Sequence, residues 1–332
     1  MRLLILGGTI FLGRHVAAEA LARGHDVTLF HRGLHGAGLF PEAEHRHGDR
    51  DGDLRALEGG RWDAAVDTSG YHPDHVAASS ALLAGARVEH LSFVSTCNVY
   101  PGWPPEPVSE DSPVWEEGDD YGHHKAASER AAEAALPGRV AHLRAGLLVG
   151  PHDNVFRLPW WVRRIAAGGE VLAPGDPERT VQLIDVRDLA AWFLDLAEQR
   201  RPGVFNATSP PGRTTMREVL EAAVAATGSD ARLTWVPDDA LVAAGVAPWM
   251  ELPLWIPEAE GAGTWHVDAA RAAAAGLRPR PVAETVADVW GWLRDGGPEA
   301  EGPDWLSPHA ATGMAPERER ELLARAAPDA AR

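Results

Sequence analysis

The first thirteen residues, MRLLILGGTIFLG (residues 1–13), decide the fold class. Leu3–Leu6 is a continuous apolar run, as expected for a strand that is buried on both faces. Glycines follow it directly, and residues 13–23 have helical spacing with Gly24 as their end. A strand, a glycine-rich turn and a helix in this order predict a phosphate-binding βαβ unit. The alternative is a purely structural turn.

The rest of the first half repeats this alternation. Further strands are expected at 26–30, 44–47, 64–67, 90–95 and 140–143, and helices at 76–83 and 121–136. This order predicts an α/β fold with a parallel, doubly wound sheet. After residue 150, proline-rich loops interrupt amphipathic helices at 180–200 and 214–227, with a return to the sheet at 204–206.

These changes suggest three parts. We expect a dinucleotide-binding domain at 1–150 and a smaller substrate-binding region at 151–295 that sends some segments back to the first domain. A C-terminal tail at 296–332 is rich in glycine, proline and charge, with one short helix at 316–325.

The composition limits the function classes. The net charge is −17 over 332 residues, which excludes a basic nucleic-acid footprint and disfavours an anionic membrane surface. The single cysteine, Cys97, excludes a disulfide scaffold and a multi-cysteine zinc site, and it fits a reducing compartment. No apolar run reaches the roughly 18 residues of a membrane span. We expect a cytoplasmic monomer or homodimer with a small-molecule substrate and no metal, nucleic-acid or membrane partner.

The glycine turn and the strand ends supply candidate cofactor-binding residues. Gly7 allows a tight turn, Gly8 a close approach to a pyrophosphate, and Gly13 close packing of helix and strand. The strand at 26–30 is followed by His31 and Arg32 instead of the acidic residue that binds the ribose of NAD. The set is Gly7, Gly8, Thr9, Phe11, Leu12, Gly13, Arg14, His31, Arg32 and Asp49.

The basic residues in this set favour NADP(H) over NAD(H). A guanidinium from Arg32 or Arg14 would pair with the 2′-phosphate of the cofactor. The alternative is that Arg32 is a solvated loop charge. Asp49 is a candidate for the adenine edge, or a turn-forming residue.

Lys125 is the only lysine among 31 basic residues, and it follows Tyr121 by four positions. Residues at this spacing share one face of a helix. A tyrosine with a reference pKa of about 10 needs a downward shift of about 3 units to act as a base near pH 7. A nearby ammonium shifts the pKa in that direction. The alternative is an ordinary pair on a helix surface.

Five segments together resemble the extended short-chain dehydrogenase/reductases, the NAD-dependent epimerase/dehydratase family. The chain is most similar to reductase-like members with a GGTxFLG-type start, a subset that also contains chloroplast stem-loop-binding proteins. The segments are GGTIFLG (7–13), FVSTCNVY (93–100), YGHHK (121–125), LRAGLLVGP (143–151) and QLIDVRDLA (182–190). The resemblance covers about residues 1–295 and implies a Rossmann-type domain with NADP(H) or NAD(H).

The resemblance also implies roles for individual residues. Tyr121 would be the catalytic acid/base, and Lys125 would bind the nicotinamide ribose and lower the pKa of Tyr121. Thr96 would hydrogen-bond the reacting oxygen, with Ser95 as the alternative. Segments lining the cofactor would add Ser69, Gly70, Ser95 and Lys125 to the candidates.

The substrate is less constrained. Ile10 replaces a glycine of the common pattern, and Leu147 stands where UDP-hexose epimerases carry a substrate-contacting asparagine. We therefore expect an apolar or aromatic carbonyl compound, bound by a tryptophan-rich wall. The alternative is that these tryptophans, which include Trp255, form a core. Substrate candidates are Trp160, Trp161, Trp249 and Arg179, with Arg157 also able to meet an anionic group; a surface charge is the alternative for both arginines.

The function that these observations favour is NAD(P)-dependent oxidoreduction at a carbinol or carbonyl carbon. A sugar-nucleotide epimerase or dehydratase is one alternative, because it begins with the same hydride step. A non-catalytic NADP- or RNA-binding regulator is the other. The set of Thr96, Tyr121 and Lys125 argues against a non-catalytic protein, and the acidic charge argues against RNA binding.

Overall fold

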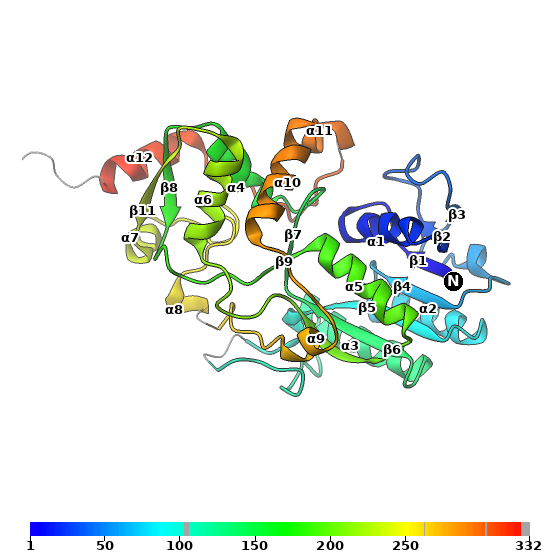
Figure 1. Ribbon diagram of the computed structural model, residues 1–332. Coiled ribbons are helices and arrows are strands. Elements are labelled where there is room, and N and C mark those ends of the chain that lie inside the picture. Colours follow the sequence, from blue (N-terminus) through cyan, green and yellow to red (C-terminus); the bar gives the residue numbers. More distant parts are fainter. Residues whose placement is uncertain (103–105, 262, 303, 327–332) are drawn as a thin grey trace, which may run out of the picture.

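The computed structural model describes residues 1–102, 106–261, 263–302 and 304–326 (Figure 1). A seven-stranded parallel sheet lies at its centre, in the order β10-β6-β5-β4-β1-β2-β3. Its strands are β1 (Arg2–Leu6), β2 (Asp26–His31), β3 (Glu44–His47), β4 (Ala64–Asp67), β5 (His90–Thr96), β6 (Val140–Ala145) and β10 (Gly203–Ala207). The expected Rossmann-type α/β fold is confirmed.

Helices cover both faces of the sheet. The first face carries α1 (Phe11–Ala22) and α5 (Val186–Glu198), and the second α2 (Pro73–Gly85) and α3 (Tyr121–Ala135). Along β1, Leu3 and Ile5 pack in the core of the first face, and Leu4 and Leu6 in that of the second. All four are at most 1% exposed, which explains why this strand is apolar from Leu3 to Leu6.

A second part lies beyond the carboxyl ends of the strands (Figure 1). Three of its helices pack on one another: α4 (Arg157–Ala166), α6 (Met216–Thr227) and α10 (Val282–Arg294). A parallel strand pair in the same part consists of β8 (Glu170–Pro174) and β11 (Arg232–Val236), and α12 (Pro316–Ala326) contacts both strands. The shorter elements are η1 (Arg55–Leu57), η2 (Cys97–Val99), β7 (Leu147–Val149), β9 (Leu183–Asp185), α7 (Asp238–Ala243), α8 (Glu258–Gly261), α9 (Ala270–Ala274) and α11 (Gly297–Glu301).

Capping side chains set where the predicted helices begin. α6 starts with a capping box between Thr215 and Glu218 and ends at Gly228, whose φ is 66°. The helix expected at 180–200 begins only at Val186, because residues 183–185 form β9 and the Asp185 carboxylate accepts the N–H of Arg187 at 2.8 Å. That part of the prediction is wrong.

The C-terminal region is more structured than expected. The helix predicted at 316–325 is present as α12, and α11 adds a short helix before it. Residues 327–332 of the expected tail lie outside the described residues. Over the ranges that the structure describes, no helix has both the length and the apolar character that crossing a membrane requires.

Candidate active site

The carboxyl edge of the sheet brings most of the candidate residues together. β4 lies between β1 and β5, and all three run in parallel, so the segments that follow them meet. The glycine turn follows β1, Ser69 and Gly70 follow β4, and Thr96 ends β5. The Ser69 hydroxyl donates to the Leu6 carbonyl at 3.2 Å, which ties the first two segments to each other.

The turn after β1 requires glycine. Gly7 and Gly8 have φ values of 107° and 103°, in the left-handed region. A Cβ at Gly13 would lie 2.6 Å from the backbone nitrogen of Gly8, so only glycine allows α1 to start this close to the strand. The first turn of α1 has no acidic residue, and Ile10 at its N-cap makes no side-chain hydrogen bond. The free N–H groups and positive helix end therefore fit a pyrophosphate.

The two arginines expected to bind a 2′-phosphate are placed differently. Arg14 donates to both carboxylate oxygens of Glu301, at 2.8 and 2.9 Å, and Glu301 also meets Nδ1 of His152 at 2.7 Å. Arg14 is thus held by the C-terminal region, whereas Arg32 is exposed after the end of β2. His31 is buried, and its ring accepts the N–H of Gly33 at 3.0 Å.

Asp49 lies in a turn after β3. One oxygen of its carboxylate, Oδ1, accepts the N–H of Asp51 at 3.0 Å, and Oδ2 takes no part in this hydrogen bond. The adjacent Arg50 donates to both oxygens of Asp67, at 2.5 and 2.8 Å, and to the Ser69 hydroxyl at 3.2 Å. Sequence reasoning missed this buried pair, which fixes the loop after β3 to the end of β4.

The Tyr121–Lys125 pair lies at the start of α3. Asp120 caps this helix by accepting the N–H of His123 at 3.0 Å, so Tyr121 is its first residue. Tyr121 is 46% exposed, whereas Lys125 is 3% exposed. The Lys125 ammonium donates to the Gly70 carbonyl at 2.8 Å and to the Val94 carbonyl, so it bridges the ends of β4 and β5.

The pKa values of this pair move in opposite directions. Burial lowers the pKa of Lys125 to about 8, and Asp67 opposes this shift. Burial, with a smaller effect from Tyr71, raises the pKa of Tyr121 to about 12, and the Thr96 hydroxyl opposes the rise. The expected lowering of the tyrosine pKa is therefore not found. Tyr121 holds its proton at neutral pH, as a proton donor must.

Ser95 faces the interior. Its hydroxyl donates to Glu129 at 2.5 Å, and Glu129 accepts two bonds from Arg144, at 3.0 and 2.8 Å. Arg144 also donates to the Tyr100 hydroxyl at 3.0 Å. This buried network holds α3, and with it Tyr121, against β5 and β6. The sequence offers one indication of this network: Glu129 lies four residues after Lys125, so both side chains share one face of the helix.

Cys97 lies beside this network. It is 4% exposed, and burial raises the pKa of its thiol to about 12, so a thiolate nucleophile is disfavoured. Within the described residues, no group of three or more His, Cys, Asp or Glu side chains is arranged to hold a metal ion.

The expected substrate residues divide by exposure. Trp161 is wholly buried, with its indole N–H donating to the Pro253 carbonyl at 2.5 Å, and Trp255 is 2% exposed. Arg179 donates to both oxygens of one carboxylate, that of Asp238, at 3.0 and 2.7 Å. Trp160 and Trp249 are half-buried and keep surface that a ligand can contact.

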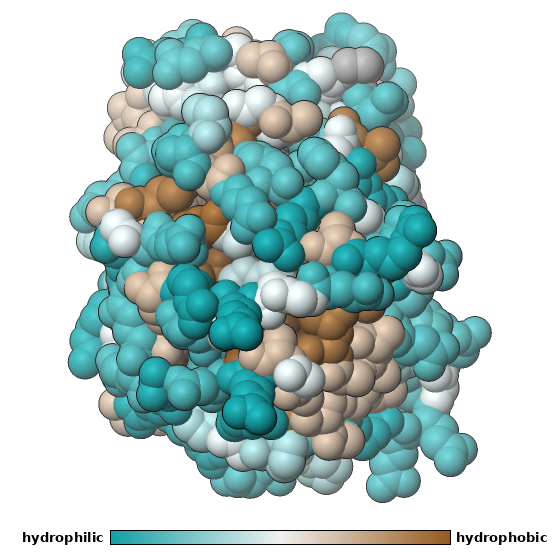
Figure 2. All heavy atoms as spheres, turned by 90° about the vertical axis from the view of Figure 1, so that its right-hand side faces the viewer, coloured by the Kyte–Doolittle hydropathy of each residue, from teal (hydrophilic) through white to brown (hydrophobic). Residues whose placement is uncertain are grey.

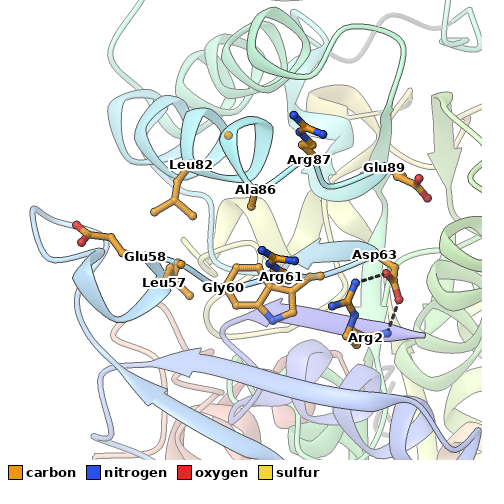
Figure 3. A pocket seen from close by; sticks show the side chains of 13 residues that line it. Arg2, Leu57, Glu58, Gly60, Arg61, Asp63, Leu82, Ala86, Arg87 and Glu89 are labelled. Atoms are coloured by element: carbon orange, nitrogen blue, oxygen red, sulfur yellow. Dashed lines mark hydrogen bonds and ion pairs between the residues drawn. The ribbon is translucent and has the colours of Figure 1, made fainter.

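An open depression lies at the opposite edge of the sheet. It adjoins the starts of β1, β4 and β5 and includes the Arg2–Asp63 ion pair (Figure 3). Ligands of parallel α/β sheets bind at the carboxyl ends of the strands. This depression is therefore distinct from the candidate site.

A model of the NAD dependent epimerase/dehydratase family matches residues 53–208, which include Thr96, Tyr121 and Lys125. The match covers a little under half of the chain. A similar protein is the chloroplast stem-loop binding protein of 41 kDa b from Arabidopsis thaliana, 28% identical over 226 residues. That match covers 62% of this chain and 58% of the plant protein, so the chain spans less than two thirds of that relative's length.

Solved structures share the fold. The Bordetella bronchiseptica enzyme WbmH, in complex with NAD+, has a TM-score of 0.69 at 19% identity, over 89% of this chain and 99% of its own. The UDP-glucose 4-epimerase of Thermotoga maritima, with UDP-glucose, has a TM-score of 0.67 at 19% identity, with the same coverage of both chains. The Thermus thermophilus UDP-glucose 4-epimerase, in complex with NAD, has a TM-score of 0.67 at 20% identity, over 89% and 100%.

Proposed function

We propose that this protein is a member of the NAD dependent epimerase/dehydratase family and an NAD(P)-dependent oxidoreductase that acts at a carbinol or carbonyl carbon, with Tyr121 moving the proton. One observation carries the proposal. A half-exposed tyrosine and a buried lysine lie on one helix face, beside Thr96, at the same sheet edge as the glycine turn. A tyrosine with a purely structural role would not require the buried lysine, Thr96 and the glycine turn beside it.

The cofactor is inferred from the residues at the turn. The N–H groups at the start of α1 would hold the pyrophosphate, and Lys125 and the Gly70 segment would lie along the nicotinamide ribose. When bound, the nicotinamide ring supplies or accepts the hydride. WbmH and the Thermus epimerase, which share the fold, are described with NAD+ or NAD.

The chain's own residues handle the oxygen of the substrate. During reduction, the Tyr121 hydroxyl donates its proton to the carbonyl oxygen, and the Thr96 hydroxyl donates a hydrogen bond to the same atom. The Lys125 ammonium stabilises the phenolate that remains. In the oxidative direction, the same groups act in reverse, with the phenolate accepting the proton.

We further propose a preference for NADP(H), which rests on Arg32 alone because Glu301 holds Arg14. A charge-assisted bond to a 2′-phosphate contributes about 1.5–3 kcal/mol, or roughly tenfold or more in affinity. Calorimetric titration should show tighter binding of NADPH than of NADH, and Arg32→Glu should reverse the order. Equal affinities in the wild-type protein would contradict the preference.

Sugar-nucleotide epimerisation is the second candidate. The family and the named UDP-glucose 4-epimerases favour it, whereas Leu147, half-buried in β7, cannot hydrogen-bond a sugar. A panel of aryl ketones and UDP- or dTDP-sugars separates the two when followed by NAD(P)H absorbance and product mass. Turnover of ketones alone is expected. Turnover of nucleotide sugars alone would replace oxidoreduction with epimerisation.

A further inference from the structure

Lys125 is a buried cation, and among the described residues its ammonium forms no ion pair with a carboxylate. The two carboxylates that act on it are Asp67, at the end of β4, and Glu129, on α3. Arg50, in the loop after β3, donates to Asp67 at 2.5 and 2.8 Å and also repels the ammonium. Arg144, in β6, donates to Glu129 at 3.0 and 2.8 Å. Because an arginine already holds each carboxylate, uncharged groups must help to keep Lys125 a cation.

Two aromatic rings lie close to this ammonium. Its nitrogen, Nζ, is 4.5 Å from the ring centroid of Phe93 and 5.7 Å from that of Tyr71. A cation within about 6 Å of the face of an aromatic ring is attracted by the quadrupole of the ring. The carbonyls of Gly70 and Val94 accept hydrogen bonds from the same ammonium. The uncharged groups around Lys125 are therefore two carbonyls and two rings.

The backbone fixes both rings. Phe93 is a fully buried residue of β5, and a Cβ at Gly70 would lie 2.6 Å from its ring, so glycine is required where the segment after β4 passes it. Tyr71 follows Gly70 directly, and its N–H donates to the Ser69 carbonyl at 3.1 Å. α2 begins two residues later, at Pro73. One ring is thus held by a central strand and the other by a short turn between a strand and a helix.

Tyr71 is 63% exposed, although it lies beside a buried ammonium. Tyrosine side chains in folded proteins are more often at least partly buried, and a single exposed ring at the carboxyl edge of the sheet lies where ligands of this fold bind. Packing in the core accounts for Phe93 but not for Tyr71. The contact between Tyr71 and Lys125 does account for it.

We propose that Tyr71 and Phe93 are positioning residues for Lys125, whose rings keep its ammonium charged and in place through cation–π attraction. The inference rests on the proposed function and deepens it, because a lysine that stabilises the phenolate of Tyr121 must remain a cation. Tyr71 and Phe93 act through Lys125 and take no part in the proton transfer themselves.

The experiment uses the fact that Lys125 is the only lysine of the chain. Protein labelled with lysine that carries ¹³C at Cε therefore gives one lysine signal, and its chemical shift against pH measures the pKa of Lys125. In Tyr71→Leu this pKa should be about 0.5–1.5 lower than in the wild-type protein, which corresponds to the loss of one ring contact. Tyr71→Phe keeps the ring and should keep the pKa.

The direction of the change separates cation–π attraction from simple packing. A ring that only shields the ammonium from water lowers its pKa, so removal of such a ring would raise the pKa towards its ordinary value of 10.5. A rise or no change in Tyr71→Leu would overturn the inference. An equal fall in Tyr71→Phe would also overturn it, because the ring is still present in that variant.

Phe93→Leu should lower the pKa of Lys125 as well. Phe30→Leu is the matched control, because Phe30 belongs to the same core cluster but lies in β2, which β1 and β4 separate from β5. It removes the same ring from the same core and should leave the pKa unchanged. A Phe93→Leu variant that behaves like the control would contradict the role of Phe93.

These titrations are done without cofactor, so their result is independent of cofactor binding. NAD+ at millimolar concentration is then added to the wild-type protein, and the lysine signal should move. An unmoved signal would count against the proposed cofactor site, whereas the pKa values of the variants would still decide the inference.

Discussion

Tyr121 and Lys125 lie one turn apart but have very different surroundings. Tyr121 is half-exposed and accessible to a ligand. Lys125 is buried, and its ammonium donates hydrogen bonds to two backbone carbonyls. The spacing of the pair was readable from the sequence because it is local. The upward pKa shift of Tyr121 was not, because Tyr71 and the packing around the hydroxyl come from other elements.

Tyr121→Phe should abolish most turnover and leave cofactor binding intact. Phenylalanine keeps the ring and removes only the proton donor, and a positioned general acid contributes about 10²–10⁴ in rate. Steady-state kinetics and an NAD(P)H titration check the two halves of this prediction. A variant that retains more than about a tenth of wild-type activity would show that another group moves the proton.

Lys125 should give the stability of the protein a specific pH dependence. The pKa of Lys125 is about 8 in the fold against an ordinary value of 10.5, so between these values the unfolded chain binds more protons and stability rises with pH. The cost of burying the charge is fully present below pH 8 and is relieved towards pH 10.5.

Lys125→Met removes this dependence. From about pH 7 to about pH 10, the unfolding free energy of the wild type should rise relative to that of the variant by roughly 2.5 kcal/mol. Hydrogen bonds lost in the variant add a nearly constant offset at both ends of the range. Urea unfolding across this range measures the movement, and a difference that stays constant would contradict the buried charge.

At the scale of elements, most strands of the first half were predictable because each is a short apolar run that indicates its own burial; β3, with the polar sequence Glu-His-Arg-His, is the exception. Contacts between elements that lie far apart in the sequence could not be predicted in this way. Arg14 has the residue type and position of a cofactor ligand, yet Glu301, 287 residues away, holds it. Trp161 has the residue type of a pocket wall, but it lies in the core of the second part. Residue type alone does not tell which surface a side chain meets.

Gly13→Ala tests the junction of β1 and α1. The added methyl would lie 2.6 Å from the nitrogen and 2.9 Å from the Cα of Gly8, and backbone atoms cannot move away cheaply. We expect a loss of about 1–3 kcal/mol in unfolding free energy and weaker NAD(P)H binding. Gly85→Ala is the control, because a Cβ there meets nothing within 4 Å. Similar stability and affinity in both variants would contradict the close packing of the turn.

At the scale of the whole molecule, charge opposes nucleic-acid binding. The net charge is −17, and the face that Figure 2 shows is mostly hydrophilic, with apolar side chains gathered in small areas. The relative from Arabidopsis is named for stem-loop binding, but an acidic chain gains little from counterion release.

The protein should therefore bind no structured RNA at physiological salt. An electrophoretic shift assay at about 0.15 M salt checks this, with a basic RNA-binding protein as the positive control. A salt-sensitive shift at submicromolar protein would favour an RNA-binding role over the enzymatic one.

A crystal structure determined with NAD+ tests the central claim most directly. The account predicts the pyrophosphate against the N–H groups at the start of α1 and the nicotinamide ribose beside Lys125, with its ring facing the Tyr121 hydroxyl. NAD+ bound elsewhere, for example in the depression of Figure 3, or no bound NAD+ at millimolar concentration, would contradict it.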